Sequence, residues 1–117
     1  MTVARARRLA EVVKEELGRM LQRELKDPRI GFVSVTEVEV SADLGHIKIY
    51  LSPFGEEEAK RQTMAGIENA RGFIRSELGQ RLGLRHTPEI ELLPDRSIER
   101  GARIISLLQE IGRERED

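Results

Sequence analysis

Few side chains in this 117-residue chain have the types and spacing that catalysis needs. His46 and His86 are far apart, and neither has a second histidine three or four residues away, so a helical metal pair is absent. No serine lies in a Gly-x-Ser-x-Gly elbow, no glycine-rich phosphate loop occurs, and there is no cysteine. Glu56, Glu57 and Glu58 are consecutive, so on a helix they would point in different directions. We therefore expect no enzyme activity, no cofactor and no bound metal.

The arginines of residues 71–88 fit a binding function better. This segment holds four arginines against a single acidic residue. Arg71 and Arg75 are four residues apart and would share a helix face, and Arg81 and Arg85 follow them. Arginines clustered in this way bind phosphates, with an affinity that falls as salt rises and with little sequence information. We predict that these four residues contact an RNA backbone, the alternative being ordinary solvated helix faces.

A second basic segment lies at the N-terminus. Residues 1–29 carry eight basic and five acidic groups. Arg19 and Arg23 are four residues apart, where like charges repel on a helix, and this spacing favours an anionic partner. We predict a second RNA contact that is formed by the basic residues of this segment, especially Arg5, Arg7, Arg8, Lys14 and Arg19.

Net charge and aromatic content narrow the mode of binding. The whole chain has a net charge of only -1, because the two basic segments alternate with two acidic ones. The aromatic residues are few, and one of them, Phe73, fits the predicted core stripe of its helix. Proteins that recognise single-stranded bases usually expose several stacking rings. The composition therefore favours recognition of the backbone and shape of folded RNA.

The first half of the chain predicts a helix followed by a β-hairpin. Apolar residues from Leu9 to Leu25, Val12 among them, recur at helical spacing and predict a helix from about residue 4 to 26, which Asp27-Pro28 ends. Strands are expected at 30–41 and 47–51, with turn residues between them. The alternation of valines changes phase inside the first strand, which predicts a bulge near Thr36-Glu37.

The second half predicts two helices, a strand and a last helix. The apolar spacing of residues 56–82 is helical, with an interruption at Gly72 and a C-cap at Gly83. A strand at 89–93 and a helix at 98–111 follow, before a short charged tail at 113–117. The order α-β-β-α-kink-α-β-α predicts a single α+β domain over residues 1–112, with a three-stranded sheet packed against helices on one face. Since no signal peptide or membrane span is visible, we expect a cytoplasmic protein that makes no membrane contact.

The order α-β-β-α-α-β is that of a type II KH domain, an RNA-binding fold. KH domains usually carry Gly-x-x-Gly between their central helices, and this sequence occurs nowhere in the chain. Ala70-Arg71-Gly72 stands there instead, followed by Phe-Ile-Arg, and this Ala-x-Gly kink resembles the helix-kink-helix of the ribosome-binding factor A family. The resemblance extends over residues 5–111 and includes the segments 21–31, 41–50, 84–90 and 95–101.

The resemblance implies a non-catalytic assembly factor in which Ala70 and Gly72 shape the kink, and since nothing in the sequence suggests an oligomer we expect a monomer. Such a factor binds the maturing 30S subunit and its 16S rRNA, and assists rRNA folding and 5′-end processing. An assembly GTPase would release it, and the family is linked to growth in the cold. Two alternatives remain open at this point. A generic KH-like module of another RNA-processing assembly would bind short single-stranded RNA, and a small hydrolase would show metal-dependent turnover.

Overall fold

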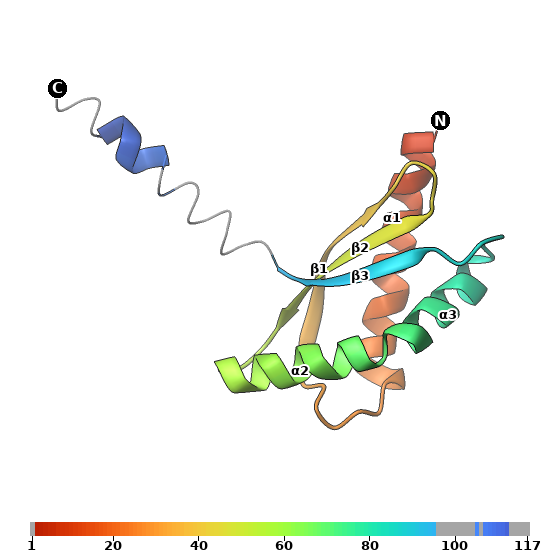
Figure 1. Ribbon diagram of the computed structural model, residues 1–117, viewed down its shortest axis with the longest axis horizontal. Coiled ribbons are helices and arrows are strands. Elements are labelled where there is room, and N and C mark those ends of the chain that lie inside the picture. Colours follow the sequence, from red (N-terminus) through yellow and green to blue (C-terminus); the bar gives the residue numbers. More distant parts are fainter. Residues whose placement is uncertain (1, 96–104, 106, 113–117) are drawn as a thin grey trace.

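The protein is an α+β domain in the computed structural model, which describes residues 2–95, 105 and 107–112. Figure 1 shows the elements in the predicted order, apart from the last helix. That helix was expected at 98–111; residues 105 and 107–112 are helical, and its other residues lie outside the described part, as does the tail at 113–117. The elements are α1 (Thr2–Arg19), η1 (Met20–Glu24), β1 (Val33–Val40), β2 (His46–Pro53), α2 (Glu57–Asn69), α3 (Arg71–Leu82) and β3 (Glu89–Pro94).

The three strands form one sheet in the order β1-β2-β3. β2 pairs antiparallel with β1 through the predicted hairpin and parallel with β3. The register of β1 against β2 shifts between Val35 and Glu37, which confirms the bulge predicted from the change of valine phase. The bulge keeps Val33 and Val35 on the same face as Val38 and Val40.

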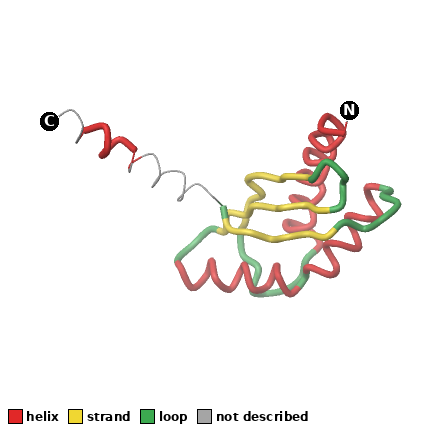
Figure 2. Tube along the Cα trace, turned by 45° about the horizontal axis from the view of Figure 1, so that its top comes forward, coloured by secondary structure: helices red, strands yellow, loops and turns green. Residues whose placement is uncertain are grey.

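All three α-helices pack on one face of this sheet (Figure 2), as predicted. Ile47, Ile49 and Leu51 of β2 are fully buried there, because alternate residues of a strand point to the same side. Their helical partners in the core are Val13, Leu17, Met20, Leu21, Ile67, Ile74 and Leu78. The opposite face of β2 carries His46, Lys48 and Tyr50, of which Tyr50 is also buried.

The first helix covers the predicted span, but its end widens into a π-turn. The amide of Leu25 donates to the carbonyl of Met20, five residues back, at 3.0 Å. Val12, expected on the apolar stripe, is 42% exposed, because the buried line passes through its neighbour Val13. The helix is therefore confirmed, while its buried face is narrower than predicted.

The interruption between α2 and α3 falls at Ala70, whose φ and ψ of -89° and 4° leave the helical range. Gly72 lies inside the first turn of α3. Because α3 buries Ile74 and Leu78, Phe73 points about 100° away from that line and is 49% exposed, so its assignment to the core was wrong. Gly83 ends α3 with a φ of +60°, which confirms the predicted C-cap.

Candidate nucleic-acid interface

A groove of about 470 Å³ lies where the start of α1 meets the end of α3. Arg5 and Arg8 line it from α1, and both are exposed. The apolar part of the lining comes from three separate segments, namely Leu9 and Val12 of α1, Leu44 of the hairpin turn, and Leu82 and Leu84 at the end of α3. Two basic segments that are distant in the sequence thus meet at one place, because Arg85 directly follows the groove residue Leu84 and is also exposed.

The hairpin turn places Leu44 in this groove through an unusual backbone conformation. Leu44 has a φ of +61°, which side chains other than glycine, asparagine and aspartate rarely adopt. The turn around it is held by Asp43, whose carboxylate accepts hydrogen bonds from the Ser41 hydroxyl at 2.6 Å and from the Gly45 amide at 2.9 Å. These bonds, the first more than the second, lower the pKa of Asp43. The conformation of the turn, which these hydrogen bonds stabilise, therefore places the apolar side chain of Leu44 in the groove.

Arg81 lies close to this region, but its charge is used inside the protein. Its guanidinium donates to Glu24 at 2.6 Å, to Glu77 at 3.0 Å and to Glu16 at 3.1 Å. The hydrogen bond to Glu24 is the main reason that the pKa of Arg81 is raised. Its side chain is only 26% exposed. Arg81 would therefore have to leave three carboxylates before it could bind a phosphate.

Arg75 is engaged in a similar way with the loop before β3. It donates to the carbonyl of Pro88 at 2.9 Å and to that of Thr87 at 3.1 Å, and it pairs with Glu89 at 3.0 Å. Arg71 stands one turn earlier and, among the residues that the structure describes, pairs only with its helical neighbour Glu68, at 3.1 Å. Both partners of that second pair are more than half exposed, and such pairs are weak in water. Arg71 is therefore much easier to recruit than Arg75.

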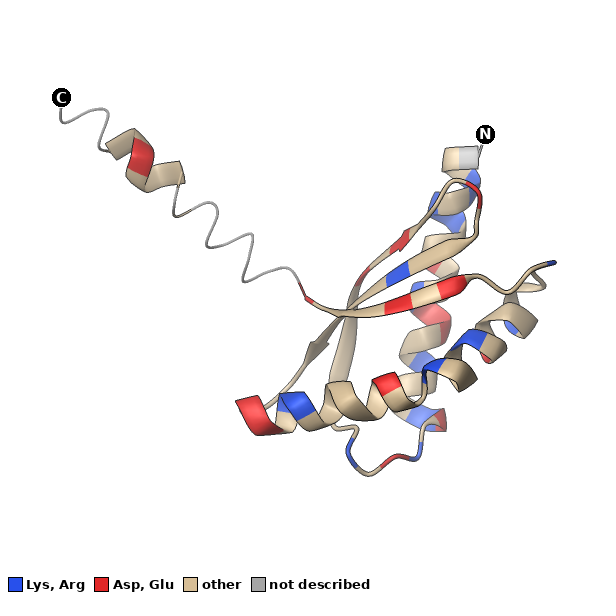
Figure 3. Ribbon diagram, viewed as in Figure 1, with Lys and Arg blue, Asp and Glu red and all other residues tan. Residues whose placement is uncertain are grey.

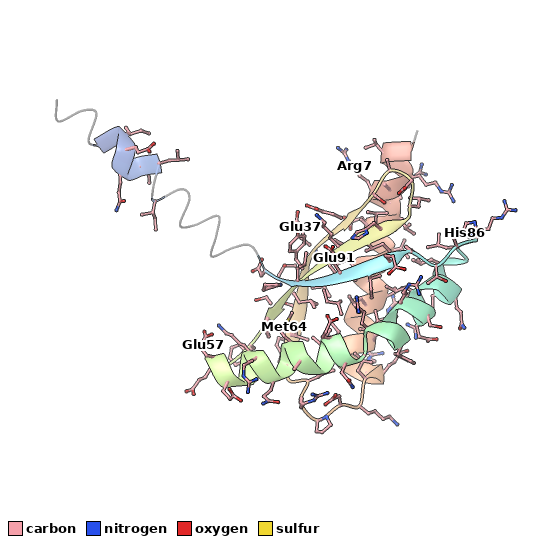
Figure 4. The ribbon with its side chains drawn as sticks, viewed as in Figure 1. Arg7, Glu37, Glu57, Met64, His86 and Glu91 are labelled. Carbon is pink, nitrogen blue, oxygen red and sulfur yellow. The ribbon has the colours of Figure 1, made fainter. Side chains whose placement is uncertain are left out.

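Arg7 and Lys14 of α1 do not share the face of Arg5 and Arg8, whereas Arg19 has nearly the helical phase of Arg8 and lies three turns further along. Arg7, labelled in Figure 4, lines a separate groove of about 280 Å³ beside β1. Lys14 lines a third one, with Phe32. Arg19 donates to Glu16 at 3.0 Å. The N-terminal cluster predicted as one contact is thus divided over several faces.

Sequence reasoning missed two kinds of residue in this region. Glu16 and Glu24 neutralise Arg81 from positions more than fifty residues away, and only the docking of α1 against α3 brings them together. Leu44, Leu82 and Leu84 build the groove from a turn and a helix end. The glycine that ends α3 was a usable signal for that helix end, whereas the contacts of Arg81 with Glu16 and Glu24 leave no local signal.

Chemistry other than binding finds little support in the described part of the chain. There, no three His, Cys, Asp or Glu side chains are grouped so that they could hold a metal ion. His46 faces Glu91 on the sheet at 3.3 Å, whereas His86 lies in the exposed loop after α3 (Figure 4), so the two histidines do not form one site. None of the described helices is long and apolar enough to cross a membrane.

Comparison with known proteins decides the family. The family model of ribosome-binding factor A matches residues 5–108. The chain belongs to the ribosome-binding factor A family. A ribosome-binding factor A from Thermosynechococcus vestitus is 50% identical over 115 residues, covering 97% of this chain and 91% of the relative. One from Trichormus variabilis is 53% identical over 112 residues, covering 94% and 84%.

Solved structures of ribosome-binding factor A share the fold. The crystal structure of the Thermus thermophilus protein aligns with a TM-score of 0.67 at 28% identity, over 79% of this chain and 98% of that one. A homology model of the Thermus thermophilus factor, fitted into a cryo-EM map of a 30S–RbfA complex, aligns with a TM-score of 0.54 at 28% identity, over 73% and 93%. The family resemblance read from the sequence is thus confirmed.

Proposed function

We propose that this protein binds the maturing 30S subunit through its 16S rRNA and assists the folding and 5′-end processing of that RNA without catalysing a reaction. The observation that carries the proposal is the groove that Arg5 and Arg8 line together with Leu84, the residue before the exposed Arg85. Membership of the family and the complex of the Thermus thermophilus factor with the 30S subunit support the choice of partner.

The charges of the two faces support an orientation on the RNA. Glu37, Glu39, Glu89 and Glu91 alternate with core residues and therefore lie on the open face of the sheet, where Lys48 is the lysine of β2. Figure 3 shows acidic residues on β1 and β3 and basic residues on α1 and α3, and the Arg75–Glu89 pair joins the two sets at one edge. Because carboxylates repel phosphates, we propose that the helical side of the molecule faces the RNA.

The basic residues then have two different roles in the proposal. Arg5, Arg8, Arg71 and Arg85 are exposed and bind phosphates directly. Other members of the predicted set, Arg75 and Arg81 above all, hold the elements that present them, and Ala70 forms the bend before Arg71. Arg7 and Lys14 make accessory contacts at most, since they lie on other faces, and Arg19 does so because it is three turns from Arg8 and bonded to Glu16.

Binding to protein-free 16S rRNA tests this assignment. We expect Arg5→Gln/Arg8→Gln and Arg85→Gln to bind several-fold more weakly than the wild type, because the first loses two phosphate contacts and the second loses one. Lys48→Gln removes the same charge from the open face of the sheet and serves as the matched control. An equal loss of affinity in all three variants would mean that only net charge matters and would refute the groove as the RNA-binding site.

Footprinting and a short RNA separate the proposal from its alternative. A generic KH-like module would bind a short single-stranded RNA as tightly as it binds 16S rRNA. We expect instead a preference for the structured rRNA, with protection of a confined region in chemical footprinting of 30S particles. Release by an assembly GTPase and a role in cold growth belong to the same proposal and rest on the family alone. A monomeric state and a cytoplasmic location also belong to it, and they rest on the sequence.

A further inference from the structure

Two aromatic rings stand exposed at the open end of the β-hairpin. Phe32 precedes β1 and is 70% exposed, and Phe54 follows β2 and is 76% exposed. Their ring centroids are 6.4 Å apart with the planes at 89°, an edge-to-face pair. The amide of Phe54 donates to the carbonyl of Phe32 at 2.9 Å, so the backbone fixes the pair in place. Paired rings with this exposure are typical of interaction surfaces.

Surface grooves that are lined partly by apolar side chains lie on both sides of this aromatic pair. Phe32 lines a hollow of about 390 Å³ with Val33 and Val35. On the other side, Pro53, the neighbour of Phe54, lines a groove of about 540 Å³ together with Leu51, Met64 and Pro94. The aromatic pair therefore belongs to a surface that could bury apolar side chains of a partner on either side of the rings.

The charges around the rings are mostly negative. Glu11 and Glu15 line the hollow at Phe32, together with Lys14. Glu57, Glu58 and Asp95 line the groove beyond Phe54, together with Lys60 and Arg61, and Glu56 adjoins it in the sequence. Arg61 is occupied by Glu58, to which it donates at 2.6 and 3.0 Å. Six carboxylates against three cations surround the rings, a balance that repels phosphates and attracts basic groups.

We propose that the Phe32–Phe54 surface binds a basic segment of a protein of the small ribosomal subunit, rich in lysine and arginine with interspersed apolar residues. The rings would receive its apolar side chains and the aliphatic stems of its cations, and the carboxylates would receive its charges. This inference rests on the proposed function, and it adds a protein contact to the RNA contact made at the arginine groove.

A double variant tests the contact in the particle. We expect Phe32→Ser/Phe54→Ser to bind immature 30S subunits at least about fivefold more weakly, as loss of an aromatic anchor usually does. Its affinity for protein-free 16S rRNA should be unchanged. Phe73→Ser removes another exposed ring, on α3, and is the matched control. An unchanged affinity for 30S subunits, or an equal loss on protein-free rRNA, would overturn the proposal.

Photocrosslinking of the otherwise intact protein covers the case in which the double variant fails to fold. A benzophenone amino acid in place of Phe54, irradiated on immature 30S subunits, should crosslink to a basic stretch of a ribosomal protein, a product that protease destroys and RNase leaves intact. Crosslinks to rRNA, or none at all, would overturn the proposal. Failure of the wild type to bind 30S subunits would instead refute the proposed function, so the two failures are distinguishable.

Discussion

Arg81 joins three elements through one side chain. Its carboxylate partners come from α1, η1 and α3, and its side chain is mostly shielded from solvent. Without this guanidinium, Glu24 and Glu77 would lose the cation that joins them to Glu16, which keeps Arg19, and like charges so close together repel. Charge reversal at Arg81 would therefore disturb the fold and could not serve as a clean test of RNA binding.

The first prediction concerns this residue. We expect Arg81→Ala to lower the Tm by roughly 5 °C, the size of shift that one lost interaction produces in a domain of this length. Arg85→Ala should leave the Tm unchanged, since no hydrogen bond or ion pair joins Arg85 to the described part of the chain. Thermal unfolding followed by circular dichroism measures both, and equal Tm values for the two variants would contradict the internal role of Arg81.

The second prediction concerns Asp27, at the exit of the first helix. Hydrogen bonds from the Arg29 guanidinium, and then from the Arg29 amide, lower the pKa of Asp27 from 3.8 to about 2. A lowered folded-state pKa stabilises the protein above the unfolded pKa, and this stabilisation is lost as the pH falls through the folded value. The difference in free energy of unfolding between wild type and Asp27→Asn should therefore shrink between pH 4 and pH 2. A constant difference would exclude a contribution from this ionisation.

At the scale of the elements, α2 packs tightly against the loop that leaves the first helix. Gly66 is buried in α2, and a Cβ there would lie 2.7 Å from Cγ1 of Ile30. Thr63 adds two polar contacts to the same loop: its hydroxyl oxygen accepts from the Gly31 amide at 3.1 Å and donates to the Arg29 carbonyl at 3.4 Å. The position of α2, and thus of the bend at Ala70, depends on this close approach.

The third prediction is that replacing glycine by alanine has opposite effects on stability at Gly66 of α2 and at Gly72 of α3. We expect Gly66→Ala to lower the free energy of unfolding by about 1–2 kcal/mol, because the added methyl overpacks the contact with Ile30. Gly72→Ala meets nothing within 4 Å and should raise it by about 0.5–1 kcal/mol through helix propensity. Chemical denaturation of both variants measures the difference, and two changes of the same sign would contradict this account of the packing.

Local patterns in the sequence were enough to predict most elements. The valine phase change located the bulge, Asp27-Pro28 marked the end of the first helix, and Gly83 marked that of α3. Phe73 was placed wrongly because the bend at Ala70 restarts the helical phase, and only the packing of α3 determines which residues then turn inward. For the site, the sequence indicated which segments are basic but not which arginines are free to bind. The contacts of Arg75 and Arg81 depend on segments that meet only through tertiary structure.

At the scale of the whole molecule, charge is divided between faces although the chain is nearly neutral. Arg5 and Arg8 of α1 line the groove, while glutamates occupy the open face of the sheet and the surroundings of the aromatic pair (Figure 3). A nearly neutral protein can thus bind a polyanion through one side only, because charges beyond about 8–10 Å are screened at physiological salt.

The fourth prediction follows from this division. The affinity for protein-free 16S rRNA should fall with rising salt, and the slope of log K against log salt should be about 0.7–0.9 per phosphate contact. We expect Arg71→Gln and Arg85→Gln each to reduce that slope by roughly one contact. Lys48→Gln should leave the slope unchanged, and a salt dependence altered equally by all three variants would contradict a one-sided interface.

The parallel pairing of β3 with β2 has a consequence for synthesis of the chain. The hairpin leaves the ribosomal exit tunnel first, whereas β3 can add to it only after α2 and α3 have been made. Until then the outer edge of β2 presents unpaired amides and carbonyls, to which a strand of another nascent chain could add. Helices form rapidly because their contacts are local. The rate at which α2 and α3 form therefore determines how long the edge of β2 in a new chain stays exposed to aggregation.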